Sequence, residues 1–329
     1  PKILSNIISS QFDIHKEFGG VVPELAARSH VEKIDLIAKK AIEESGASIE
    51  EVSAIAATVG PGLIVCLTVG LNFGKAIAGF ADKPFVAVNH LEGHALSPGL
   101  SGNIKFPYLL LLVSGGHTQF LIVENINQYK QLGTTIDDAL GEAFDKTAKM
   151  LELGYPGGPA VEKFAKQGDK NYFKLPQPII NKAGCNLSFS GLKTAVLRES
   201  KKIKNNNQLK YNLAASFQET IINILRKKTE IAFNEFIMLN GSRNKTFVVA
   251  GGVAANESIR ISLKEIAKKN NFKPVFADIK YCGDNAAMIA WAGIQRYKKK
   301  LTNNLDVEPK SRWPLDLKAK FMKGPGLKL

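Results

Sequence analysis

The sequence predicts a mixed α/β protein built from two lobes. Apolar runs of strand length alternate with stretches of helical periodicity, as in sheets whose strands are joined by helices. Two of the strands, one in each half of the chain, end in a Gly-Gly pair. With 329 residues, of which 45% are hydrophobic, the chain is long enough to bury two cores.

The first half is expected to begin with a strand at residues 4–10. An amphipathic helix over 23–44 is closed by Gly46, since glycine adopts the left-handed conformation that ends helices. An apolar strand at 52–59 then leads through Gly60-Pro61-Gly62 to a helix over 67–80. A buried strand at 84–88 completes this alternation.

The next expected strand is the most apolar of the chain, at 108–113, and residues 119–123 are its expected hairpin partner. The other expected elements are a short strand at 187–192 leading into a helix that holds Lys193, a helix over 212–238, a strand from 247 followed by a helix to 269, a strand at 275–277 and a helix over 286–300. The tail from Leu301 is polar, and we expect it on the surface.

The segment His90-Leu91-Glu92-Gly93-His94 is a candidate metal site. If it forms a helical turn, two imidazoles four residues apart lie on one face, which is the usual spacing for two ligands of one divalent metal. The segment also follows strand 84–88, and open α/β sheets bind ligands at the carboxyl ends of their strands. A histidine pair on a half-buried loop is the alternative, but two of the 5 histidines in the chain occur here.

A zinc protease is the first function that such a pair suggests. Proteases of the HExxH type carry their general base directly after the first histidine. In this chain that position is Leu91, and the acid is Glu92. At about 100° per residue, Glu92 lies roughly 200° around the helix from His90 and points away from a metal held by the pair. The geometry therefore disfavours a protease.

The two Gly-Gly turns are candidate anion sites. Ser114–Thr118 follows the strand at 108–113, and successive glycine N–H groups beside two hydroxyls can cradle a phosphate. The second turn, at Gly251-Gly252, precedes a helix whose N-terminus would add partial positive charge. A plain hairpin turn explains either one alone. Together, one in each half, they indicate a nucleotide held between two lobes.

Two aspartates have open interpretations from the residues alone. Asp145 lies in an apparent helix and is either a solvated partner of Lys149 or an acceptor for a ribose hydroxyl. Asp284 directly precedes the helix over 286–300, where an N-cap is the simpler interpretation.

Composition narrows the functional classes. Three widely spaced cysteines without a CxxC pair indicate a reducing compartment. The longest apolar runs are of strand length, so no membrane span and no membrane partner are expected. The net charge of +14 suits a polyanionic partner, although a bias towards lysine, asparagine and isoleucine could also produce it.

Together these motifs resemble the TsaD family, the tRNA N6-adenosine threonylcarbamoyltransferases, formerly described as O-sialoglycoprotein endopeptidases. The resemblance runs from Ile8 to about Pro314. It is carried, in order, by Gly19-Gly20-Val21-Val22-Pro23-Glu24-Leu25-Ala26, Gly60-Pro61-Gly62-Leu63, His90-Leu91-Glu92-Gly93-His94, Val113-Ser114-Gly115-Gly116-His117-Thr118-Gln119, Gly141-Glu142-Ala143-Phe144-Asp145-Lys146, Tyr155-Pro156-Gly157-Gly158-Pro159, Phe189-Ser190-Gly191-Leu192-Lys193, Ala250-Gly251-Gly252-Val253 with Asn256, and Asp284-Asn285.

The resemblance implies an actin-like, sugar-kinase and heat-shock ATPase fold, with two RNase H-like lobes around a nucleotide cleft. The lobes would be residues 1–125 and 126–314, the second with helical insertions, followed by a surface tail at 315–329. One metal per chain, Fe(2+) or else Zn(2+), would be bound by His90, His94 and Asp284, which replaces the N-cap interpretation. The residues implied to bind the substrate are Val113, Ser114, Gly115, Gly116, His117, Asp145, Gly158 and Asn256. No catalytic residue beyond the metal centre is implied.

The implied reaction transfers threonylcarbamoyl from threonylcarbamoyl-AMP to N6 of the adenosine 3′ of the anticodon, in tRNAs that read codons beginning with A. The alternatives are the disfavoured metalloprotease and a non-catalytic actin-like ATPase module, which would need no metal triad. Implied partners are tRNA, a paralogous actin-like subunit (TsaB-like) and a P-loop ATPase (TsaE-like), in the bacterial cytosol or an organelle matrix. Lysine-rich runs at 201–204, 226–228 and 298–300 are a candidate tRNA track or solvated helix faces.

One departure from the family pattern concerns the start of the chain. Family members begin with a strand and a Glu-Thr-Ser-Cys-Asp-Glu-Thr loop that forms the first phosphate turn, and Pro1 lies beyond both. We therefore expect the sequence to be incomplete, and expect a protein that starts at Pro1 to retain metal but to transfer little threonylcarbamoyl.

Overall fold

The structure is a computed structural model that describes residues 1–16, 18, 20–203, 206–241 and 244–319. The chain forms two compact units. Unit 1 comprises residues 1–104, 126–128 and 283–317, and unit 2 comprises residues 105–125, 129–282 and those from 318 onwards. Gly19, Lys204 and residues 320–329, assigned above to a family motif, the lysine track and the surface tail, lie outside the described residues.

Unit 1 combines segments from both ends of the chain. Its helices and strands, in chain order, are α1 (Phe12–Lys16), α2 (Pro23–Ser45), β1 (Ile55–Gly60), α3 (Ile64–Phe80), β2 (Phe85–Asn89), α4 (His90–Leu96), the 3-10 helix η1 (Ser97–Leu100) and α10 (Ala286–Lys298).

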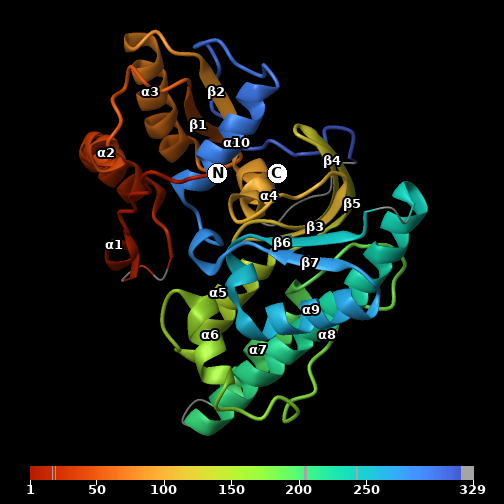
Figure 1. The fold of residues 1–329 in the computed structure, drawn as a ribbon. Helices are drawn as coiled ribbons and strands as arrows, with labels where there is room; N and C mark the ends of the chain where they lie inside the picture. The colour runs from red at the N-terminus through yellow and green to blue at the C-terminus, as the bar shows by residue number, and fades with distance from the viewer. Residues whose placement is uncertain (17, 19, 204–205, 242–243, 320–329) are drawn as a thin grey trace. The chain divides into compact units, whose positions relative to one another are not determined.

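The core of unit 1 is a helix–sheet–helix sandwich around the parallel strands β1 and β2 (Figure 1). Helix α3 lies close to one face because Gly74 has no side chain; a Cβ there would lie 3.0 Å from that of Ala57. Helix α10 lies on the other face, where a Cβ on Gly293 would lie 2.6 Å from that of Ala56. Successive strand residues point to opposite faces, so neighbouring alanines contact different helices.

A late segment of the chain binds the two strands of unit 1. The N–H of Asn303 donates to Phe85 O at 2.8 Å, and the N–H of Lys310 donates to Val59 O at 2.8 Å. Lys310 passes so close that a Cβ on Gly60 would collide with its carbonyl oxygen. Trp313 packs against the small core of this unit. The tail from Leu301 is therefore largely exposed, as predicted, but part of it is tied to the sheet.

Unit 2 contains the larger sheet and most of the helices. Its elements are β3 (Tyr108–Val113), β4 (Thr118–Asn125), β5 (Gln128–Thr134), α5 (Leu140–Leu151), α6 (Gly157–Ala165), α7 (Ser190–Lys202), α8 (Asn207–Asn240), β6 (Thr246–Ala250), η2 (Gly252–Ala255), α9 (Glu257–Lys269), β7 (Lys273–Phe276) and η3 (Ile279–Tyr281).

The sheet of unit 2 has the strand order β5-β4-β3-β6-β7. Strands β3 and β4 form the predicted antiparallel hairpin. Strand β6 pairs in parallel with β3, and β7 pairs in parallel with β6. Leu109, Leu111 and Val113 alternate onto one face and join the core made by the helices. Figure 1 shows α5 to α9 on one side of this sheet. The predicted mixed α/β class is therefore confirmed.

Three local expectations were wrong. Residues 4–10 form no strand; they are mostly exposed, and the side chain of Asn6 accepts the N–H of Ala287 at 3.2 Å. Residues 187–192 make only an isolated bridge at Leu187, and α7 already begins at Ser190. The Gly251-Gly252 turn opens η2 rather than α9. A strand requires a paired neighbour, which a local pattern does not supply.

Among the described residues, no helix combines the length and apolar character that a membrane span requires. The lobes predicted at 1–125 and 126–314 stay a prediction.

Candidate active site

Helix α4 carries the histidine pair and is held at its start by Asn89. All five residues of β2 are buried, and α4 follows this strand without a loop. Asn89 Oδ1 accepts the N–H of Leu91 at 2.9 Å, and its Nδ2 donates to Trp313 O at 2.9 Å. Because an N-cap residue fixes where a helix begins, His90 occupies the first position of α4. The predicted helical turn is confirmed.

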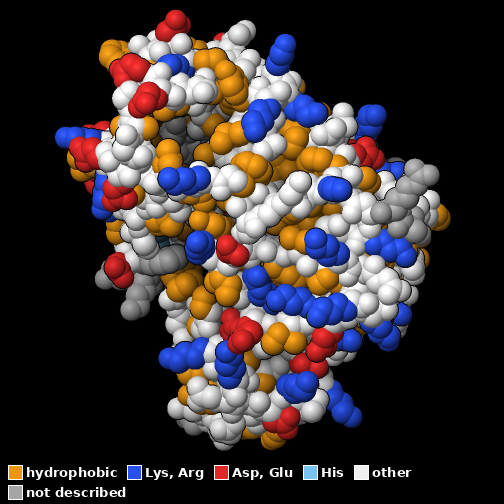
Figure 2. All heavy atoms as spheres, viewed as in Figure 1, with side chains coloured by type: hydrophobic (Ala, Val, Ile, Leu, Met, Phe, Trp, Pro, Cys, Tyr) orange, Lys and Arg blue, Asp and Glu red, His pale blue; other side chains and the backbone are white. Residues whose placement is uncertain are grey.

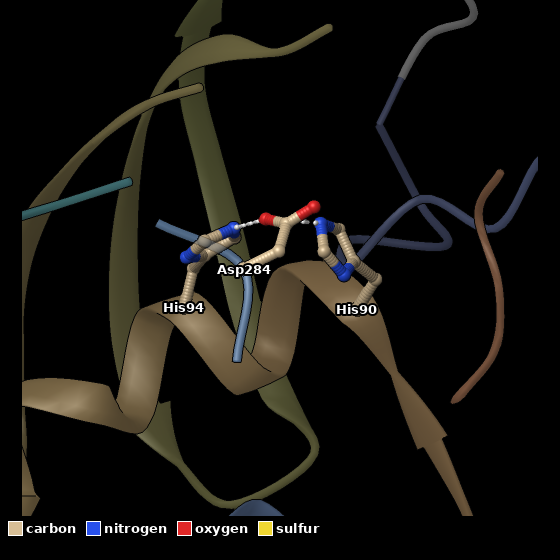
Figure 3. A group of neighbouring side chains, drawn as sticks. All are labelled: His90, His94 and Asp284. Atoms are coloured by element: carbon tan, nitrogen blue, oxygen red, sulfur yellow. Dashed lines mark hydrogen bonds and ion pairs between the residues drawn. The ribbon is translucent and has the colours of Figure 1, made fainter. Parts of the chain in front are cut away.

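Three candidate metal ligands converge in unit 1. His90 Nε2 lies 3.5 Å and His94 Nε2 3.1 Å from the same oxygen, Asp284 Oδ1. Figure 3 shows the carboxylate between the two imidazoles, which both project from α4. The His94 side chain is fully buried, whereas the Asp284 side chain is 77% exposed. The group is therefore anchored on the helix side and open on the carboxylate side.

These distances fit one metal ion. Metal–nitrogen and metal–oxygen bonds of about 2.0–2.2 Å place neighbouring ligand atoms about 3.0–3.5 Å apart, and the two nitrogen–oxygen separations lie in that range. The candidate ligand atoms of all three residues lie within 4.8 Å of one another. Two nitrogens and one oxygen are donors suited to Fe(2+) and Zn(2+).

The pKa shifts of His90 and Asp284 are in the directions that suit metal binding. Burial lowers the pKa of the His90 imidazole, and this exceeds the opposing effect of the Asp284 charge. Desolvation raises the pKa of the Asp284 carboxyl, but the hydrogen bond with His94 and the charges of both histidines lower it below its usual value. A neutral imidazole and an ionised carboxylate are the forms that bind a metal.

Asp284 is not the N-cap of α10. Asn285 fills that position, with its Oδ1 accepting the N–H of Met288 at 2.9 Å. Asp284 therefore lies just outside the helix, and its carboxylate is free to face the histidines (Figure 3).

Glu92 lies on the opposite side of α4 from the histidines, as the helical spacing predicted. Its side chain is 1% exposed and forms an ion pair with Arg296, with Glu92 Oε2 2.8 Å from Arg296 Nη1. Glu92 is therefore not available as a general base for a metal-bound water, which removes the mechanism of an HExxH protease.

The first Gly-Gly turn, in unit 2, rests on the N-terminus of α5. The N–H of Ser114 donates to His117 O at 2.8 Å and closes the turn, while Gly141 donates to Ser114 O at 3.2 Å. A Cβ on Gly141 would lie 2.7 Å from the Cα of Gly115, so only glycine permits this approach. Gly115 and Gly116 are exposed, with open space beside their Cα atoms. A ligand can reach these backbone groups, as a phosphate cradle requires.

The second turn lies beside the end of β3. Gly251 has a φ of 99°, in the left-handed region, and a Cβ there would collide with Val113 O. The Val113 side chain is itself fully buried, so any ligand contact at this residue would involve its backbone. Asn256 caps α9 through its Oδ1, which accepts the N–H of Ile259 at 3.0 Å. Its Nδ2 donates to Gln218 Oε1 at 2.8 Å.

Asp145 ties α5 to the start of α6. Its Oδ1 accepts the N–H of Gly157 at 2.9 Å. The sequence predicted Lys149 or a ribose hydroxyl as the partner of Asp145, and this backbone contact was not among the predictions. Desolvation raises the pKa of the Asp145 carboxyl, while hydrogen bonds from the Gly157 and Gly158 backbone partly offset this. Gly158 lies beside this contact with open space at its Cα.

Comparison with known proteins identifies the family. The family model described as TsaD, tRNA N6-adenosine threonylcarbamoyltransferase, matches residues 2–291. The chain belongs to the TsaD family.

Curated relatives in the TsaD family cover nearly the whole chain. A tRNA N6-adenosine threonylcarbamoyltransferase of Pelagibacter ubique is 62% identical over 100% of this chain and 92% of its own length. The protein of the same name from Rhodospirillum rubrum is 49% identical over 99% of this chain and 90% of its own length.

Solved structures of HypF share the fold. Full-length HypF in its phosphate- and nucleotide-bound form superposes with a TM-score of 0.58 at 12% identity, covering 81% of this chain and 41% of HypF. HypF of T. kodakarensis gives a TM-score of 0.57 at 14% identity, covering 84% of this chain and 44% of HypF.

In this TsaD chain, the predicted metal ligands all lie in unit 1 and the predicted substrate-binding residues all lie in unit 2.

Two groups that anchor these elements were not predicted from the sequence. One is the Glu92–Arg296 pair. The other is Asp137, whose Oδ1 accepts the N–H of Phe189 at 2.7 Å and whose Oδ2 accepts the hydroxyl of Ser190 at 2.8 Å, which fixes the start of α7. Asp137 was visible as a charged residue, but its partners are more than 50 residues away in the chain.

Proposed function

We propose that this chain transfers the threonylcarbamoyl group from threonylcarbamoyl-AMP to N6 of the adenosine directly 3′ of the anticodon, in tRNAs that read codons beginning with A. The product is N6-threonylcarbamoyladenosine (t6A). Membership of the TsaD family and the names of its relatives support this activity. The observation that carries the proposal beyond family membership is the convergence of two imidazoles and one carboxylate on a single point in unit 1.

The reaction is an acyl-type transfer with AMP as the leaving group. The N6 amine attacks the carbamoyl carbon, a C–N bond forms, and the bond from that carbon to the phosphate oxygen breaks. AMP leaves with the electron pair, and the amine loses one proton. In this proposal the exposed backbone of Gly115 and Gly116 binds the AMP phosphate, and Asp145 on α5 and Gly158 on α6 also contact the adenylate. The protein thus contributes binding, orientation and charge stabilisation.

We propose that His90, His94 and Asp284 hold one Fe(2+), with Zn(2+) as the alternative. A set of two histidines and one carboxylate with open positions is typical of non-haem Fe(2+) sites. When bound, the ion supplies a Lewis acid that can orient the acyl-adenylate and polarise its carbamoyl carbonyl. The exposed Asp284 side chain leaves this side of the group accessible to a substrate.

We propose tRNA, a paralogous actin-like subunit and a P-loop ATPase as partners, in the bacterial cytosol. The net charge of +14 suits tRNA. On the face drawn in Figure 2, Lys and Arg side chains gather over β7 and α9, where Lys264, Lys268 and Lys273 are exposed.

The test is a transfer assay with threonylcarbamoyl-AMP and substrate tRNA, with and without the two partner proteins. Labelled threonine should enter the tRNA and be recovered as t6A after digestion to nucleosides. His90→Ala and Asp284→Ala should each remove both the bound metal, measured by elemental analysis, and the transfer. Asp278→Ala, which changes an exposed aspartate six residues before Asp284, is the matched control and should retain both. Full metal retention in a His90→Ala/Asp284→Ala double variant would contradict the metal centre.

A further inference from the structure

A buried charge network lies on the side of α4 that faces away from the histidines. Glu92 Oε2 pairs with Arg296 Nη1 at 2.8 Å, and Glu92 Oε1 accepts the backbone N–H of Asn127 at 3.0 Å. The same Nη1 donates to Asn127 Oδ1 at 3.2 Å. The Glu92 and Arg296 side chains are 1% and 8% exposed. All three residues belong to unit 1.

Stability alone does not account for this network. Burying two charges removes their hydration, and a buried ion pair is often no more stable than an apolar pair of the same volume. Arg296 Nε is also buried without a hydrogen-bond partner among the described residues, which adds an unsatisfied donor. What a buried pair can supply is a defined geometry, since removing either charge leaves the other uncompensated.

The two charged residues lie on the two elements that carry the candidate ligands. Glu92 lies on α4 between His90 and His94. Arg296 lies on α10, which begins two residues after Asp284. At 1.5 Å per residue, Arg296 is about 18 Å along this segment from Asp284, so the pair acts on the far end of the same rigid element.

Close steric contacts bring α4 and η1 against α10. A Cβ on Gly93 would lie 2.8 Å from Ile289 Cδ1, and a Cβ on Gly99 would lie 2.8 Å from Trp291 Nε1. These contacts set how closely the elements approach. The Glu92–Arg296 pair and its hydrogen bonds to Asn127 add a directional constraint, because their atoms must meet at hydrogen-bonding distance and angle.

We propose that Glu92 and Arg296 are positioning residues that fix the register of α4 against α10 and so hold the two imidazoles at the Asp284 carboxylate. Neither residue touches the metal position. The inference rests on the metal role proposed above for His90, His94 and Asp284. It assigns Glu92 a function different from that of the general base in HExxH proteases.

The test measures metal binding directly and needs no activity assay. Metal-free protein is titrated with Co(2+) in the presence of a competing chelator, which gives both the affinity and the visible ligand-field spectrum. Glu92→Gln keeps the shape of the side chain and an acceptor for Asn127 but removes the charge. It should weaken Co(2+) binding about 10-fold to 100-fold, the range seen when outer partners of metal ligands are lost, and should change the spectrum. Arg296→Lys keeps the charge, whereas Arg296→Met removes it. Arg296→Lys should therefore lose less Co(2+) affinity than Arg296→Met, each compared with the parent protein.

The control separates positioning from a general loss of stability. The Lys228 side chain is fully buried in unit 2 and donates to Lys182 O at 2.7 Å and to Gly184 O at 3.0 Å, so Lys228→Met removes a buried charge and its hydrogen bonds outside unit 1. This variant should bind Co(2+) with unchanged affinity and an unchanged spectrum, whatever happens to its melting temperature.

A folded Glu92→Gln variant with Co(2+) affinity within twofold of the parent and the same spectrum would overturn the inference. If the single variants fail to fold, Glu92→Met/Arg296→Met removes both charges at similar volume and should fold. The inference then requires weakened Co(2+) binding in the double variant, and parental binding would overturn it. If the parent chain binds no Co(2+), the metal centre itself is contradicted, and this inference falls with it.

Discussion

Two adjacent glycines, Gly157 and Gly158, lie in different surroundings. A Cβ on Gly157 would lie 2.5 Å from the Cα of Asp145, whereas one on Gly158 would meet nothing within 4 Å. The first contact involves the backbone of α5, which no rotamer change can relieve. Gly157 is therefore required by packing, while Gly158 leaves room for a ligand.

Gly157→Ala should lower the free energy of unfolding by about 1–3 kcal/mol, the usual effect of overpacking. Gly158→Ala is the matched control. It should be neutral or slightly stabilising, because alanine is favoured over glycine within a helix by up to about 1 kcal/mol. Urea unfolding followed by circular dichroism measures both. A Gly157→Ala variant as stable as Gly158→Ala would mean that α5 and α6 relax around the added methyl group.

At the scale of residues, the geometry of the histidine pair was predictable from the sequence, whereas the charge pair behind it was not. The four-residue spacing placed His90 and His94 on one face and turned Glu92 away, because helical geometry is local. Arg296 carries no such signal. It lies in an ordinary amphipathic pattern, and its burial follows from a contact with Glu92 more than 200 residues earlier in the chain.

At the scale of elements, the basic face of α9 differs from the lysine runs identified in the sequence. Lys264 and Lys268 are one helical turn apart and exposed, and Lys264 Nζ lies 5.4 Å from the centre of the Phe276 ring on β7. Lys228, from the run at 226–228, is instead fully buried and donates to Lys182 O at 2.7 Å and Gly184 O at 3.0 Å. Lys201, Lys202, Lys227 and the lysines at 298–300 are exposed, so these parts of the runs stay a candidate tRNA track.

The double variant Lys264→Gln/Lys268→Gln should bind tRNA with a flatter salt dependence. Each lost phosphate contact lowers the slope of log affinity against log salt by about 0.7–0.9, so the expected reduction is about 1.4–1.8. The matched control is Lys39→Gln/Lys40→Gln on α2, which removes the same charge from two exposed lysines paired with Glu43 and Glu44. Equal slopes for the two double variants would return the α9 face to the role of a solvated surface.

Helices and strands were predictable where the pattern of apolar residues within the segment itself determines the structure. The hairpin of β3 and β4 and the helix α2 have strong apolar periodicity and appear within a few residues of the expected bounds. The strand expected at residues 4–10 failed because strand formation depends on a neighbour. The start of α9 shifted because Asn256 caps the helix, and η2 takes up the preceding turn.

At the scale of the whole molecule, metal binding should stabilise unit 1. An ion that binds the folded state but not the unfolded state adds about 2.7 kcal/mol at one hundred times its dissociation constant. Chelator treatment should therefore lower the temperature of a calorimetric transition of the parent protein. The same treatment should leave His90→Ala unchanged, because that variant lacks a ligand. An identical chelator effect in both proteins would show that the stabilising ion binds elsewhere.

The fold class followed from the alternation of strands and helices, but the composition of the units did not. Unit 1 draws on residues 1–104 and 283–317. The contacts that join these segments, such as Asn303 with Phe85, connect residues more than 200 positions apart. Local periodicity contains no information about pairs at that separation.

The late segment that binds β1 and β2 has a consequence for how the chain folds on the ribosome. Ribosomes add about 5–20 residues per second, so roughly 10–40 s pass between synthesis of α4 and synthesis of Trp313. The residues of unit 2 up to Cys282 have all been added before Asp284 and α10 are made. During that interval the nascent β1 and β2 lack their backbone partners at Asn303 and Lys310. The histidine pair, made early, must likewise wait for its carboxylate, so the metal centre is among the last features of the molecule to form.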